Sequence, residues 1–235
     1  MKVQLVWEHN GDDTILYAQN LPGAFARGSS LAVAQGKMEA EIRAFRRWAG
    51  EAVPENITLV LAQKKRSSLN IADADSDVIF DTEREPLTRE EYEMQKALVL
   101  KSAADFQTLY DGIPDKNTSI LPVRKTFYGP VPRTAEEMYV HTKNVNEYYF
   151  WEVGVDTDNA GTILECRARG FEKLEQIPGF LDKGAVTGSY DEEWSLRKLL
   201  RRFLWHDRIH GKAMYRMALR TFGKDSIPDV FRFEK

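Results

Sequence analysis

The sequence predicts an α+β module at the N-terminus, followed by an all-α four-helix bundle. The first observation is that short segments before residue 62 alternate apolar and polar residues and are separated by turn signals. The second is that apolar residues after residue 88 recur at helical spacing. The third is the length of 235 residues, for which two domains are the natural expectation. We therefore predict domains at 1–81 and 88–235, with 81–87 as the linker.

The predicted N-terminal module combines strands with one helix. Asn10-Gly11, a strong hairpin signal, separates the first two strands, and a Leu-Pro-Gly turn precedes the third. Gly28-Ser-Ser30 caps a helix that Gly50 and Pro54 end. The predicted strands are Lys2–Glu8, Thr14–Ala18, Ala24–Arg27, Asn56–Ala62 and, further on, Asp77–Phe80.

The predicted bundle rests on four capping-box patterns, in which a hydroxyl residue is followed three positions later by Glu. A single match is common by chance, but four matches that each open an apolar, helically spaced segment favour four helices. The patterns begin at Thr88, Thr134, Thr162 and Ser189. The helices they predict are 89–110, 135–153, 163–174 and 192–222.

Composition excludes several classes of protein. The single cysteine, Cys166, excludes an intrachain disulfide framework and fits a reducing compartment. The formal net charge of −3 disfavours a nucleic-acid-binding surface. No apolar run approaches the roughly 20 residues of a membrane helix, and the N-terminus shows no apolar signal core. We therefore expect a cytoplasmic protein that does not enter a membrane.

Histidines supply the candidate site. His206 and His210 are four residues apart, so on a helix they lie one turn apart on one face. His141 lies on the apolar stripe of the predicted second helix and is the candidate third ligand. Three imidazoles leave a coordination position open for water or substrate. The alternative for a histidine pair at this spacing is an ordinary half-buried helix surface.

Imidazole ligands suit several divalent metals, and we expect zinc, nickel or iron, with copper also compatible. Asn144 and Tyr148 follow His141 by one and two turns, and with Arg202 they are the candidate substrate-binding residues. Glu147 and Asp207 are carboxylates near the ligands that can orient an imidazole, although ordinary surface or bundle positions are the alternative. We interpret the arginines of the last helix as a solvated face paired with Glu.

A family resemblance covers about residues 88–222. The run from Thr134 through His141 to Tyr148 is similar to the histidine-bearing second helix of the DinB-like (damage-inducible) superfamily. The run from Arg197 through His206 to His210 is similar to the last long helix of that family. The resemblance implies a four-helix bundle that binds a divalent metal through these histidines. It also implies a relation to transferases and isomerases that use low-molecular-weight thiols.

A second resemblance covers about the first 65 residues. The run Leu-Pro-Gly-Ala-Phe-Ala-Arg-Gly-Ser-Ser from Leu21, with a helix that ends at Phe45-Arg-Arg-Trp48, resembles the HicB-like antitoxin module. This resemblance implies a fold more than an activity. A small structural or oligomerising domain is the alternative interpretation of this segment.

Three functions follow as hypotheses. The first is a metal-dependent transferase or hydrolase whose partner is a small-molecule substrate or a low-molecular-weight thiol. The second is a non-catalytic binding or regulatory module with a structural metal or none. The third, nucleic-acid binding, is disfavoured by the acidic charge. A homodimer is a further expectation.

Overall fold

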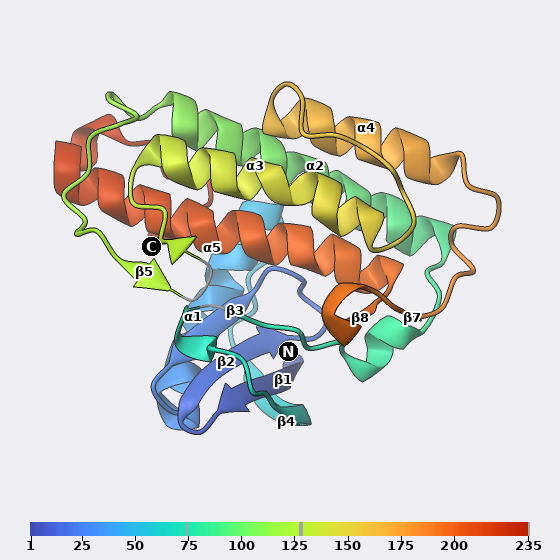
Figure 1. The fold of residues 1–235 in the computed structure, drawn as a ribbon. Coiled ribbons are helices and arrows are strands. Elements are labelled where there is room, and N and C mark those ends of the chain that lie inside the picture. The colour runs from blue at the N-terminus through green and yellow to red at the C-terminus, as the bar shows by residue number, and fades with distance from the viewer. Residues whose placement is uncertain (74, 127–128, 235) are drawn as a thin grey trace. The chain divides into compact units, whose positions relative to one another are not determined.

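The computed structural model describes residues 1–73, 75–126 and 129–234 (Figure 1). It confirms a mixed α and β chain, with a sheet and one helix in the N-terminal part and a helical region after it. The chain forms two compact units. The first comprises Met1–Thr88, Leu181–Trp205 and Glu234–Lys235, and the second comprises Arg89–Phe180 and His206–Phe233. The proposed domains 1–81 and 88–235, as family modules, stay a prediction.

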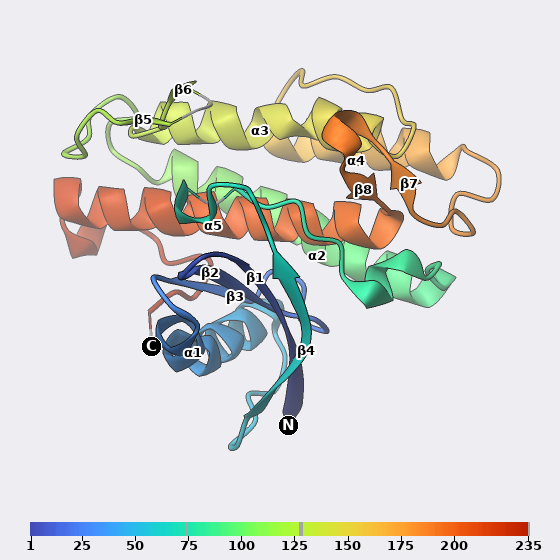
Figure 2. The ribbon, with the colours of Figure 1, turned by 60° about the horizontal axis from the view of Figure 1, so that its bottom comes forward.

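A four-stranded sheet forms the centre of the first unit. Its strand order is β3-β2-β1-β4, with β1 antiparallel to β2 and parallel to β4. Helix α1 packs against β2 and β3, as Figure 2 shows. The strands are β1 Lys2–Asn10, β2 Asp13–Ala18, β3 Phe25–Gly28 and β4 Thr58–Arg66, and α1 spans Leu31–Ala49.

Helix α1 begins and ends where the sequence predicts. The Ser30 Oγ accepts a hydrogen bond from the Val33 backbone N–H, which satisfies an amide of the first turn. Gly50 ends the helix with a positive φ of 76°, a conformation that glycine adopts without a steric penalty. One face of α1 is buried and contributes Met38, Ile42 and Phe45 to the core of the first unit.

The predicted strand at Asp77–Phe80 is wrong, because the structure has no regular secondary structure there. Side chains of α5, which spans Leu196–Phe222, donate hydrogen bonds to carbonyl groups of this segment. The Lys198 Nζ donates to the Asp77 oxygen at 2.8 Å, and the Arg201 Nη2 donates to the Val78 oxygen at 2.8 Å. The backbone therefore has hydrogen-bond partners without joining a sheet.

The second unit is helical. It contains α2 Arg89–Asp111, α3 Ala135–Trp151, α4 Ile163–Glu175 and the part of α5 from His206 onward. Helix α4 packs against both α2 and α3. At one crossing Gly170 of α4 lies directly against the ring of Phe150 of α3, where a larger residue would collide with the ring.

Two of the four predicted capping boxes are confirmed in full. Thr134 and Thr162 each accept a hydrogen bond from the N–H three residues on, and Glu137 and Glu165 bond back to the capping residue. The capping box predicted at Ser189 is wrong. Ser189–Asp191 forms an isolated helical turn with Tyr190 at φ 60°, and α5 begins later, at Leu196.

The remaining strands are short. The long connection after α2 contains strands β5 Lys125–Thr126 and β6 Gly129–Pro130, and the segment before α5 contains β7 Val186–Thr187 and β8 Glu193–Trp194. Among the described residues, no helix combines the length and apolar character that crossing a membrane requires.

Candidate metal centre

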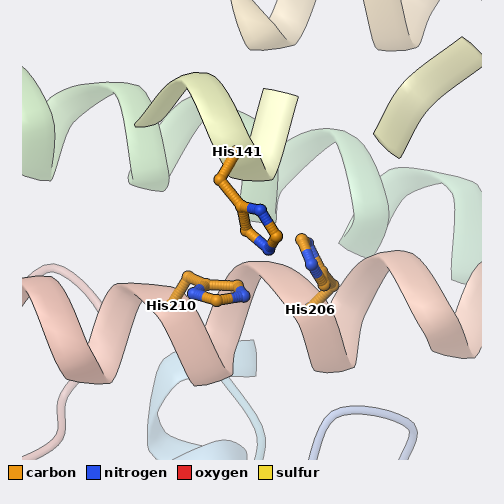
Figure 3. A group of neighbouring side chains, drawn as sticks. All are labelled: His141, His206 and His210. Atoms are coloured by element: carbon orange, nitrogen blue, oxygen red, sulfur yellow. The ribbon is translucent and has the colours of Figure 1, made fainter. Parts of the chain in front are cut away.

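Two helices of the second unit position the three predicted histidines. His141 lies on α3, which the Thr134 cap starts two turns earlier. His206 and His210 lie one turn apart on α5. Figure 3 shows the three rings turned toward one another from the two helices. The structure thus brings together all three residues that the sequence singled out.

The imidazoles are close enough to bind one ion. The ring centroids are 5.2 Å apart for His141 and His206, 4.6 Å for His141 and His210, and 4.5 Å for His206 and His210. One ring nitrogen from each residue can be chosen so that all three lie within 4.8 Å of one another. Nitrogens bound to a common tetrahedral ion lie about 3.4 Å apart, as Zn–N bonds of about 2.1 Å require. Small side-chain movements would therefore close the site.

The protein around His141 favours the neutral form of its imidazole. The surrounding protein lowers the pKa of His141 below its ordinary value by desolvation. A metal binds the neutral form of histidine, so this shift reduces competition from protons. His206 is buried, His210 is half-buried and His141 is exposed, so the cluster has a protein side and a solvent side. Three nitrogen donors with one open side suit a metal that keeps a position for an exogenous ligand.

A buried ion pair fixes the part of α5 that carries the histidines. Asp207, adjacent to His206, accepts hydrogen bonds from both terminal nitrogens of Arg167 on α4, at 3.2 and 3.3 Å. Both side chains are fully buried. Burial raises the pKa of Asp207, and the charge of Arg167 opposes that shift. Because the pair restricts rotation of α5 about its axis, it helps to hold His206 and His210 toward α3.

Tyr149 of α3 adds a packing contact that the sequence analysis missed. Its ring meets the His206 ring edge-on, with centroids 5.9 Å apart, and it is buried. This contact limits the orientations open to the His206 ring. The sequence spacing could have indicated this contact, because Tyr149 lies eight residues after His141 and so falls near the same face of the helix.

The residues predicted to bind substrate fall into two places. Asn144 and Tyr148 lie on α3 and line a solvent-open hollow together with Glu147, Trp151, Asp156 and Thr157. Arg202 is buried in the first unit, where its Nη1 donates to the Ser76 oxygen at 2.5 Å and its guanidinium lies over the Trp194 and Trp205 rings. Its role as a substrate-binding residue stays a prediction.

The arginine-rich face of the last helix is not the solvated face that we predicted. Arg201, Arg202 and Arg208 are buried. Arg201 forms a buried ion pair with Glu83, and Arg208 lies over the Phe231 and Phe233 rings. The buried guanidinium groups are part of the packing. A carboxylate, a carbonyl group or aromatic rings contact each of them and offset the cost of its desolvation.

Comparisons with protein-family models, with curated proteins and with solved structures found no match to the chain.

Proposed function

We propose that His141, His206 and His210 bind one divalent metal ion, zinc, nickel or iron, and that the chain is a metal-dependent enzyme of the DinB-like type. The observation that carries the proposal is the convergence of three imidazoles from two helices, with their ligand atoms within 4.8 Å. The donor set fits such an ion, because three neutral nitrogen ligands and one open side are typical of catalytic rather than structural sites. Such a metal, when bound, polarises a substrate oxygen or favours the thiolate form of a thiol.

The four helices α2–α5 are, in this proposal, the four-helix bundle of that superfamily. Packing of α4 on α2 and α3, together with the approach of His141 on α3 to the α5 histidines, supports it. The order of one early and two late histidines supports it as well. We propose a low-molecular-weight thiol or another small molecule as the substrate.

The first unit has, in the same proposal, a HicB-like fold. The order of two strands, a Leu-Pro-Gly turn, a short strand, a helix and a final strand parallel to the first supports this proposal.

Metal content tests the proposal most simply. The protein, purified without a polyhistidine tag, is expected to carry close to one equivalent of a transition metal by elemental mass spectrometry. The His206→Ala/His210→Ala double variant should carry only traces. His9 provides the matched control, because it is the remaining histidine, lies in the first unit and stacks on Trp7. His9→Gln should retain the metal of the wild type. Equal metal in the wild type and the double variant would reject the site.

A further inference from the structure

A hollow on the second half of α3 has the size of a small-molecule site. It has a volume of about 440 Å³ and lies open to solvent on one side. Ligand sites in proteins commonly have volumes of a few hundred cubic ångströms. Its walls come from the second half of α3 and the loop that follows, with Asn144, Glu147, Tyr148, Trp151, Asp156 and Thr157 as lining residues. All six belong to the second unit.

Aromatic side chains form the apolar part of this hollow. Trp151 is 63% exposed, which is unusual for so large an apolar side chain. Tyr148 precedes it by three residues, close to one helical turn, so both rings lie on the same side of α3. Rings of Trp and Tyr attract organic cations through their negative faces, and Trp does so best. The aromatic lining therefore offers a surface for an apolar group that carries positive charge.

The polar part of the hollow is acidic. Glu147 and Asp156 are exposed, and neither carboxylate forms an ion pair within the part of the chain that the structure describes. The Glu147 Oε2 accepts a hydrogen bond from Asn159 at 3.1 Å, which orients it without neutralising its charge. Lys173 bonds the backbone oxygen of Asp156 at 2.9 Å. No lining residue is cationic, so the hollow disfavours anions and attracts cations.

Thr157 gives an independent observation that points to a ligand in this hollow. It is only 5% exposed, and among the described residues its Oγ1 is buried without a hydrogen-bond partner. A buried hydroxyl without a partner is uncommon and costs free energy. Because Thr157 lies in the wall of the hollow, a polar group of a bound molecule, or a water held with it, would account for this hydroxyl.

We propose that this hollow binds an organic cation, specifically an alkylammonium group carried on a small apolar body. Trp151 and Tyr148 would contact the alkyl groups, and Glu147 and Asp156 would balance the charge. Tyr148 lies two turns beyond His141, or about 10 Å along the helix. A role of this cation as the substrate of the metal centre would rest on the proposed function. Binding of the cation in the hollow requires no metal.

A pair of isosteric probes tests the charge requirement. Choline and its neutral isostere 3,3-dimethyl-1-butanol are titrated separately into ¹⁵N-labelled protein at constant ionic strength. The indole N–H of Trp151, assigned with a Trp151→Phe variant, should shift in a saturable manner with choline. The neutral alcohol should bind at least tenfold more weakly. Equal binding of the two probes, or no saturable shift at Trp151 with millimolar choline, would overturn the proposal.

Matched carboxylate variants locate the site. Glu147→Gln/Asp156→Asn should weaken choline binding at least tenfold and leave binding of the neutral alcohol unchanged. Glu90→Gln/Glu172→Gln removes two exposed carboxylates of the same unit outside the hollow and should leave choline binding unchanged. Equal weakening by both double variants would show a general charge effect and overturn the assignment.

The histidine variant separates this inference from the proposed function. His206→Ala/His210→Ala should bind choline as tightly as the wild type, because the hollow contains neither histidine. Metal loss with choline binding retained supports both proposals. If the wild type carries metal but does not bind choline, only the cation site is rejected. If the wild type binds choline but carries no metal, only the metal centre is rejected.

Discussion

The pair of Arg167 and Asp207 is the most consequential contact at the scale of single residues. Both side chains are fully buried, and they join α4 to the turn of α5 that carries His206. Removal of one partner leaves a buried charge without compensation, which typically costs about 3–5 kcal/mol. Asp207→Ala should therefore lower the free energy of unfolding strongly, as measured by urea denaturation.

A double variant provides the control for that prediction. Arg167→Met/Asp207→Leu removes both charges and fills similar volume with apolar groups, so it should recover much of the lost stability. A wild-type urea midpoint for Asp207→Ala alone would contradict the account of this pair.

Glu8 predicts a pH dependence in the first unit. Ser76 donates a hydrogen bond to its Oε2 at 2.5 Å, and burial raises the pKa of Glu8 from 4.5 to about 7. Between these values the folded protein binds more protons than the unfolded chain. The stability that Glu8 contributes is therefore present below pH 4.5 and is lost as the pH rises through 7.

Glu8→Gln removes this titration. From pH 5 to pH 8, the unfolding free energy of the variant should rise by about 2.5 kcal/mol relative to that of the wild type, because most of the interval between pKa 4.5 and about 7 lies in this range and one pKa unit corresponds to about 1.4 kcal/mol. Urea denaturation at four pH values in that range measures the difference. Parallel pH profiles of the two proteins would show that Glu8 titrates in its ordinary range.

The sequence could predict the pairing of His206 with His210 because that information is local: the two residues follow the spacing of one helical turn. The approach of His141, on another helix, was an expectation from its apolar stripe and from the DinB-like resemblance. The ion pair between Arg167 and Asp207 could not be predicted in the same way, since the partners lie 40 residues apart on different helices. The apolar residues Val78 and Phe80 suggested a strand, but Lys198 and Arg201, far along the chain, take its carbonyl groups instead.

Close packing of α3 and α4 is the main feature at the scale of elements. A Cβ atom at Gly170 would lie 2.0 Å from the Phe150 ring, which is buried and packed edge-on against Phe171. Gly170→Ala should therefore lower the free energy of unfolding by about 1–3 kcal/mol, the range of overpacked cores. Thermal unfolding followed by circular dichroism measures this change.

Gly36 of α1 is the matched control, because a Cβ atom there would meet no other atom within 4 Å. Gly36→Ala should raise stability by up to about 1 kcal/mol through helix propensity. If both substitutions change the free energy of unfolding in the same direction, the account of the α3–α4 contact is wrong.

The starts of the helices show where a local sequence pattern does and does not predict the structure. Thr134 and Thr162 form the predicted capping boxes because each pattern needs only four consecutive residues. The same pattern at Ser189 does not start a helix. Tyr190 and Asp191 adopt positive φ there, and Ser195 instead bonds the Lys198 N–H at the true start of α5.

Metal binding should be visible in the stability of the whole molecule. An ion that binds only the folded chain stabilises it by about 2.7 kcal/mol at one hundred times its dissociation constant. Addition of zinc to metal-free protein should raise the melting temperature, and a chelator should reverse the change. The His206→Ala/His210→Ala variant should not respond, and an equal shift in that variant would place the zinc elsewhere.

The most direct test of the metal centre is anomalous X-ray scattering from crystals of the metal-loaded protein. Data collected on both sides of the absorption edge of the bound metal locate the ion without assumptions about its ligands. The account predicts one peak about 2.1 Å from a ring nitrogen of each of His141, His206 and His210. A peak that lacks any one of these nitrogens, or a loaded protein with its metal elsewhere, would contradict it.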